Sequence, residues 1–189
     1  MHARDRLWGL LSHRVVPAHA CWFCSGPEHF AAIVAPLATA ALGADRSVRV
    51  MGPSDFVEAL RADRRLPPAR RLAIEAIDGG LHASRAEELL DGVPAGTLVV
   101  NATAWDEARG RPSGAELERL DHLETLLGRL VTSGLVVGLC VYALSAVCRW
   151  QAAVLAERHH AHVLAAGRLL PFSEALGKPI ESLPPALAD

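Results

Sequence analysis

Two short runs of the sequence, residues 97–102 and 135–142, are apolar on both of the faces that an extended chain presents. Successive side chains of a strand point to opposite faces of its sheet, so such a strand needs cover on both sides. Parallel sheets that are covered by helices have this pattern. The feature predicts an α/β fold, built as a mostly parallel sheet with helices on both faces.

The rest of the sequence alternates between strand-like and helical segments. Further strands are expected at 18–24, 46–51, 71–77 and 162–166, with Gly167 as a turn after the last of them. Helices are expected at 27–42, at 56–61 with Ser54 as its cap, at 84–90, at 113–133 and at 143–158. We therefore expect an N-terminal helix and linker at 1–17, one α/β domain at 18–170 and a C-terminal tail at 171–189.

The composition bounds the function classes. The chain of 189 residues is 51% apolar and 21% charged, with a net charge of −2, as in a globular domain without a basic surface for nucleic acid. No uncharged apolar run reaches about 20 residues, so no membrane span is expected. There is no secretory signal, which predicts a cytoplasmic protein with reduced cysteines. Trp8 and its neighbouring leucines predict a homodimer through the N-terminal helix.

The turn at 24–29, after the first strand, lacks the sequence features of a phosphate-binding loop. It holds a single glycine, no Gly-Lys-Ser/Thr, and the carboxylate of Glu28 where phosphate would lie. No Gly-x-Ser-x-Gly elbow occurs either, so we expect no catalytic activity. Ligands of parallel sheets bind beyond the carboxyl ends of the strands, which here means near 24–29, 51–54, 102–105 and 142–143.

Cysteines and histidines near the first strand raise a second hypothesis. Cys21 and Cys24 have the spacing of metal ligands, and His19 and His29 flank them. However, two residues three apart on a strand face opposite sides of the sheet, and no second such pair exists. A redox pair is less favoured, because Cys21 lies upstream of the helix start. A metal or haem sensor that uses Cys21, Cys24 and the histidines therefore stays an alternative.

Aromatic residues point to the capture of a small molecule. Trp22, Phe23, Trp105 and Tyr142 fall in or just after expected strands. Aromatic side chains that carry one polar group are typical of small-molecule pockets, although such side chains are also common in hydrophobic cores.

Short motifs in a fixed order resemble one family. They are His-Ala-Cys-Trp-Phe at 19–23, Ala-Trp at 104–105, His-Leu-Glu at 122–124 on the long helix, Gly-Leu-Cys-Val-Tyr at 138–142, and Arg-His at 158–159 before the last strand. In this order, over about residues 15–170, the chain resembles the methanogen/methylotroph DcmR sensory domain, MEDS. Cys24, Ala143 and His160 depart from the family pattern.

The resemblance implies a RecA/P-loop-like core without a functional phosphate loop. It also implies a non-catalytic sensory domain that binds a small organic molecule, needs no cofactor, and signals through a protein partner in a transcription or sigma-factor pathway. The alternative on the same core is a degenerate RecA-like nucleotide-binding protein or NTPase. We predict that the ligand site is lined by His19, Cys21, Cys24, His29, Trp105, Glu124, Cys140 and Tyr142.

Overall fold

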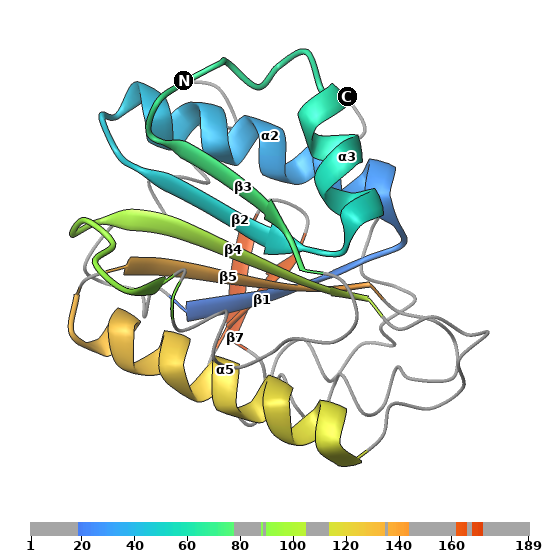
Figure 1. The fold of residues 1–189 in the computed structure, drawn as a ribbon, viewed down its shortest axis with the longest axis vertical. Helices are drawn as coiled ribbons and strands as arrows, with labels where there is room; N and C mark the ends of the chain where they lie inside the picture. Colours follow the sequence, from blue (N-terminus) through green and yellow to red (C-terminus); the bar gives the residue numbers. More distant parts are fainter. Residues whose placement is uncertain are drawn as a thin grey trace.

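The computed structural model describes residues 19–77, 88, 90–104, 114–134, 136–143, 162–165 and 168–171. These residues form a seven-stranded sheet with the order β3-β2-β4-β5-β1-β6-β7 (Figure 1). Neighbours from β3 to β6 pair in parallel, whereas β7 is antiparallel to β6. The strands are β1 (His19–Cys24), β2 (Val48–Gly52), β3 (Leu72–Ala76), β4 (Thr97–Ala104), β5 (Val136–Ala143), β6 (His162–Ala165) and β7 (Arg168–Pro171).

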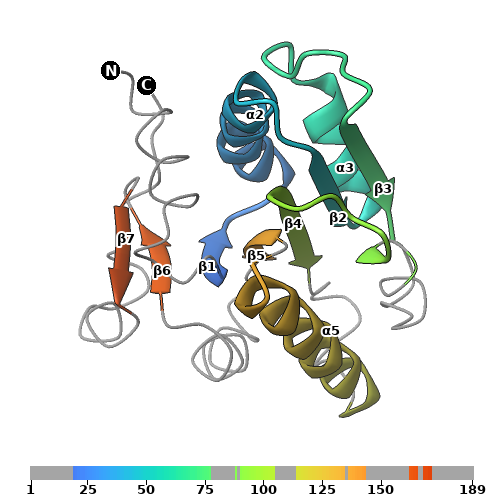
Figure 2. The ribbon, with the colours of Figure 1, turned by 90° about the vertical axis from the view of Figure 1, so that its left-hand side faces the viewer.

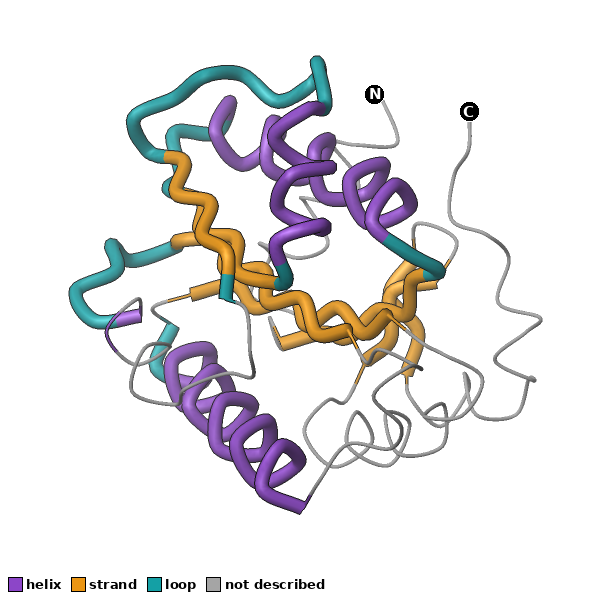
Figure 3. The backbone as a smooth tube through the Cα atoms, turned by 45° about the vertical axis from the view of Figure 1, so that its right-hand side comes forward, coloured by secondary structure: helices purple, strands orange, loops and turns teal. Residues whose placement is uncertain are grey.

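Helices cover both faces of the sheet, which confirms the predicted α/β fold class. The helices are α2 (Pro27–Gly43), α3 (Ser54–Ala62) and α5 (Gly114–Thr132). Figure 2 shows α2 and α3 together on one side of the sheet and α5 on the other, with β6 and β7 at the far edge beyond β1. The same layering of helices around strands is seen from another direction in Figure 3. We call the two sides the α2 face and the α5 face.

The α2 face holds the larger hydrophobic core. Pro27 begins α2 at a position where a missing N–H costs nothing. Phe30 of α2 and Phe56 of α3 then meet edge to face, with ring centroids 5.2 Å apart. Alternate side chains of the central strands complete this core, among them Ala20, Trp22, Cys24, Leu98, Val100, Ala102, Leu139 and Val141.

The α5 face takes the other alternate residues of the same strands. Leu120, Leu123 and Leu127 of α5 repeat at helical spacing and pack onto the sheet. The strand residues below them include Cys21, Met51, Val99, Cys140 and Tyr142.

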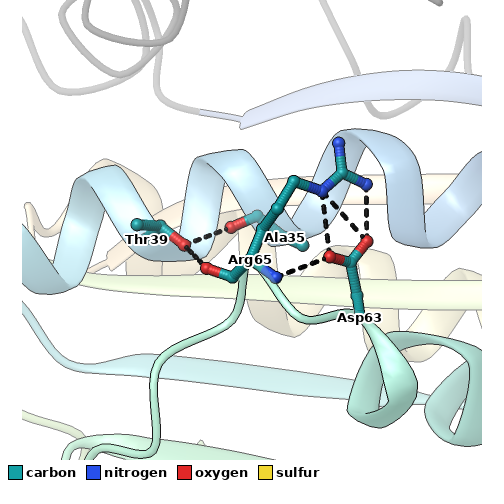
Figure 4. A network of polar contacts seen from close by, with 4 residues as sticks. All are labelled: Ala35, Thr39, Asp63 and Arg65. Atoms are coloured by element: carbon teal, nitrogen blue, oxygen red, sulfur yellow. Dashed lines mark hydrogen bonds and ion pairs between the residues drawn. The ribbon is translucent and has the colours of Figure 1, made fainter.

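The connection after α3 is tied back to α2 by polar contacts (Figure 4). The hydroxyl of Thr39 lies 2.8 Å from the carbonyl oxygens of Ala35 and Arg65. Arg65 in turn donates from its backbone N–H and its Nε to Asp63 Oδ1, both across 2.9 Å. These contacts hold the chain over α2 before it returns to form β3.

Several sequence predictions need correction. Strand β4 runs to Ala104 and is not apolar on both faces, because Asn101 and Thr103 follow Val99 on the α5 face. Pro53, and not Ser54, occupies the cap position of α3. Strand β7 was predicted as a turn and tail. The segments predicted at 1–17, at 143–158 past β5, at most of 84–90 and beyond 171 lie outside the described residues, as does a dimer contact through 1–17.

Candidate functional site

A buried carboxylate on α5 gathers three polar side chains from the sheet. Glu124 is fully buried and accepts hydrogen bonds from the Tyr142 hydroxyl at Oε1, across 2.7 Å, and from the Cys140 thiol at Oε2, across 3.0 Å. His19 Nε2 lies 3.2 Å from the same Oε2 and 3.4 Å from Cys140 Sγ. We call these four residues the Glu124 cluster.

The fold explains why residues so far apart in sequence meet. Strands β1 and β5 are neighbours, and their register pairs Cys21 with Cys140. Residues two apart on a strand share a face, so His19 and Cys21 of β1 lie on the same side as Cys140 and Tyr142 of β5. The helix α5 packs on this side of the sheet, where its Glu124 contacts Cys140.

Burial and the negative charge of Glu124 both raise the pKa values of the neighbouring groups. Burial, followed by the negative charge of Glu124, raises the pKa of the Cys140 thiol and of the Tyr142 hydroxyl well above their usual values. The same two causes raise the pKa of Cys21. All three groups are therefore protonated near neutral pH, so Tyr142 and Cys140 can donate to the carboxylate.

A second set of polar groups lies on β4 beside this cluster. Asn101 is 1% exposed, and among the described residues neither its amide nitrogen nor its amide oxygen has a hydrogen-bond partner. Thr103 Oγ1 is likewise buried and has no partner within the described part of the chain. The register places Asn101 opposite Cys140 and Thr103 opposite Tyr142. We call Asn101 and Thr103 the β4 polar pair.

The position of the β4 polar pair is the one where sheets of this type bind ligands. Strand β2 leads into α3 on the α2 face, whereas the next described helix after the neighbouring β4 is α5 on the opposite face. Adjacent strands whose helices lie on opposite faces form a topological switch point, and ligands bind at its carboxyl side. Asn101 and Thr103 belong to the carboxyl half of β4 at this point.

Five of the eight predicted site residues share one face, and two do not. His19, Glu124, Cys140 and Tyr142 form the Glu124 cluster, and Cys21 packs in the same core. Cys24 belongs to the core of the α2 face. The structure therefore separates Cys24 from Cys21 and His19, so these three cannot chelate one ion as the metal alternative required.

His29 lies on the α2 face of the sheet, apart from the Glu124 cluster. His29 lies on α2, where Nδ1 is 3.1 Å from Ser25 Oγ and the ring meets Trp22 edge to face at 4.9 Å. Burial lowers its pKa below 6.5. Trp105 lies outside the described residues. The connection from β1 to α2 consists of only Ser25 and Gly26, with Glu28 in the first turn of the helix.

The sequence prediction missed the β4 polar pair. Both residues stand at alternate positions of a strand that is otherwise apolar after its first residue, Thr97. A polar residue inside a doubly covered strand is the signal that could have found them, because its polar atoms must be satisfied on a buried face.

Comparisons with known proteins add a likeness of fold at low similarity. No protein-family model matches the chain, and no curated protein matches it. A solved structure described as an ATPase domain matches with a TM-score of 0.44 and 10% identity, over 78% of this chain and 69% of that chain. A DnaB-like replicative helicase, solved for its interactions with primase, matches with a TM-score of 0.39 and 12% identity, over 71% of this chain and 41% of that chain. No activity follows from a likeness at this level.

Within the described residues, no helix combines the length and the apolar character that crossing a membrane requires.

Proposed function

We propose that this chain is a regulatory domain that binds a small polar organic molecule on the α5 face, at the carboxyl ends of β2 and β4. The observation that carries the proposal is the β4 polar pair, whose buried amide and hydroxyl groups lack partners among the described residues. A buried polar group without a partner costs about 1–3 kcal/mol. A ligand that supplies both a donor and an acceptor would remove this cost.

The surroundings of the β4 polar pair indicate the chemistry of the ligand. Met51 on one neighbouring strand and Tyr142 on the other offer apolar surface on the same face. The Phe23 ring lies against that of Tyr142, with centroids 5.8 Å apart. Small alcohols, amides and short-chain acids combine a compact apolar part with one or two hydrogen-bonding groups, as such a site requires.

The signalling part of the proposal comes from the resemblance to the MEDS domain. In that picture the bound molecule alters α5, which the Glu124 cluster joins to the sheet, and a separate protein partner responds to the change. We propose binding and not catalysis, because the described residues beside the β4 polar pair form hydrogen bonds and pack in the core.

A thermal-shift screen tests this function. The panel contains small alcohols, amides, short-chain acids and chlorinated hydrocarbons, together with ATP and GTP. We expect at least one organic compound to raise the Tm, and Thr103→Val and Asn101→Ser to remove that shift. Thr97→Val is the matched control, because it makes the same change at the other end of β4, where Thr97 Oγ1 already donates to the Pro94 carbonyl across 2.6 Å.

The screen has two outcomes that contradict the proposal. If both β4 variants retain the Tm shift, the ligand binds elsewhere. If no organic compound raises the Tm, the chain does not bind the class of ligand that we propose. A shift with nucleotides alone would instead support the degenerate RecA-like nucleotide-binding protein.

A further inference from the structure

We propose that His19, Glu124 and Cys140 bind one divalent cation of the zinc class. The three residues offer an imidazole nitrogen, a carboxylate oxygen and a sulfur, all within 4.8 Å of one another. The site is distinct from the β4 polar pair and does not depend on the function proposed above.

The distances between the three ligand atoms are all shorter than the edges of a zinc tetrahedron, by about 0.1 Å for two of them and about 0.5 Å from Cys140 Sγ to Glu124 Oε2. With the usual bond lengths of zinc, the edges of its tetrahedron are about 3.3 Å from nitrogen to oxygen and about 3.5 Å from sulfur to either. The corresponding distances here are 3.2 Å from His19 Nε2 to Glu124 Oε2, 3.0 Å from Cys140 Sγ to Oε2, and 3.4 Å from Nε2 to Sγ. An ion therefore fits between them once these side chains move apart by those amounts.

Three separate elements hold these ligands in place. His19 begins β1, Cys140 lies in the middle of β5, and Glu124 lies on α5. Gly128 is one turn after Glu124, and the Nδ1 edge of the His19 ring faces it: a Cβ at Gly128 would be 3.7 Å from His19 Nδ1, an ordinary contact. That orientation directs the opposite nitrogen, Nε2, toward Glu124 and Cys140.

The remaining oxygen of the carboxylate has a partner of its own. Tyr142 donates to Glu124 Oε1, which leaves Oε2 as the atom shared by His19 and Cys140. Hydrogen bonds of this kind orient carboxylate ligands in metal sites. Tyr142 is thus a positioning residue for the site and not a ligand.

Charge explains why the ion should be a divalent metal that accepts sulfur. When M²⁺ binds, the S–H bond of Cys140 breaks, the proton leaves to solvent, and the thiolate, the carboxylate and a neutral imidazole surround the ion. One thiolate and one carboxylate balance the two positive charges, so no net charge is buried. Mg²⁺ and Ca²⁺ prefer oxygen ligands, whereas zinc and its analogues accept this mixed set.

Titration of the chelator-treated full chain with Zn²⁺ and Co²⁺ tests the site. We expect one ion per chain and a cobalt spectrum with a sulfur-to-metal charge-transfer band. Cys140→Ser should remove that band, and both Cys140→Ser and His19→Ala should weaken binding by more than about tenfold. Cys24→Ser is the matched control, because Cys24 is equally buried on the other face.

These measurements distinguish metal binding at His19, Glu124 and Cys140 from metal binding elsewhere in the chain. A cobalt complex without a thiolate band, or no binding to the wild-type chain, overturns the proposal. So does a loss of binding in Cys24→Ser with full binding in Cys140→Ser, which would point to the other face. Circular dichroism checks folding, and if Cys140→Ser does not fold, unchanged affinity in His19→Ala overturns the proposal by itself. The organic-ligand screen contains no metal, so either proposal can fail alone.

Discussion

Tyr142 donates its hydroxyl proton to Glu124 across 2.7 Å, and this bond joins the carboxyl end of β5 to α5. Both side chains are fully buried. Removal of the hydroxyl by Tyr142→Phe keeps the ring beside Phe23 but leaves a carboxylate oxygen without this donor. We expect the free energy of unfolding to fall by about 1–3 kcal/mol, measured by urea denaturation.

A double-mutant cycle with Glu124→Gln tests how much of this loss depends on the charge of Glu124. If the negative charge of Glu124 strengthens the bond, Tyr142→Phe costs clearly less in the Glu124→Gln background than in the wild type. Equal costs in the two backgrounds would mean that the charge adds nothing, because the amide oxygen introduced by Glu124→Gln can still accept from the hydroxyl.

Cys24 should resist alkylation in the native protein. Burial raises the pKa of its thiol to about 12, so the reactive thiolate fraction at pH 8 is on the order of 10⁻⁴. Mass spectrometry after brief iodoacetamide treatment should find Cys24 unmodified in the folded chain and modified in urea. Rapid native labelling of Cys24 would show that the α2 face is open there.

His29 should make stability depend on pH. Burial lowers the pKa of His29 below the 6.5 of the unfolded chain, so the unfolded state binds the proton more readily. Its contribution to stability is therefore complete above pH 6.5 and is lost as the pH falls through the depressed value. An NMR titration should give a midpoint below 6.5, and His29→Gln should lose less stability than the wild type between pH 7.5 and 5. A midpoint at or above 6.5 contradicts the described environment.

Two glycines should respond to alanine in opposite directions. At Gly52, a Cβ would lie 2.7 Å from the Cβ of Ala102 on the neighbouring strand, so Gly52→Ala should destabilise the fold by about 1–3 kcal/mol. At Gly128 on α5, the nearest atom is His19 Nδ1 at 3.7 Å, an ordinary contact. Gly128→Ala should therefore raise the free energy of unfolding by about 0.5–1 kcal/mol through helix propensity. Urea denaturation of both variants checks the pair, and a shared sign would contradict the packing.

The pattern of apolar residues predicted the parallel sheet because burial on both faces leaves a direct trace in the sequence. It also predicted that Cys21 and Cys24 would face opposite sides. It could not predict the hydrogen bond between Glu124 and Tyr142, since the position of α5 above β5 arises only from tertiary packing; only the family resemblance placed both residues in one site. Asn101 was missed because it was averaged into an apolar strand at 97–102, and Thr103 because that strand was expected to end before it. Strand β7 was missed because a strand of four residues after Gly167 resembles a tail.

We propose above that a small molecule binds against the β4 polar pair. The most direct measurement is the NMR signal of the Asn101 side-chain amide in the full chain, recorded with and without the best organic compound from the screen. We expect a saturable shift of that amide, together with shifts at Thr103 and Tyr142 on the same face. Saturable shifts confined to residues of the α2 face, with the Asn101 amide unchanged, would contradict it.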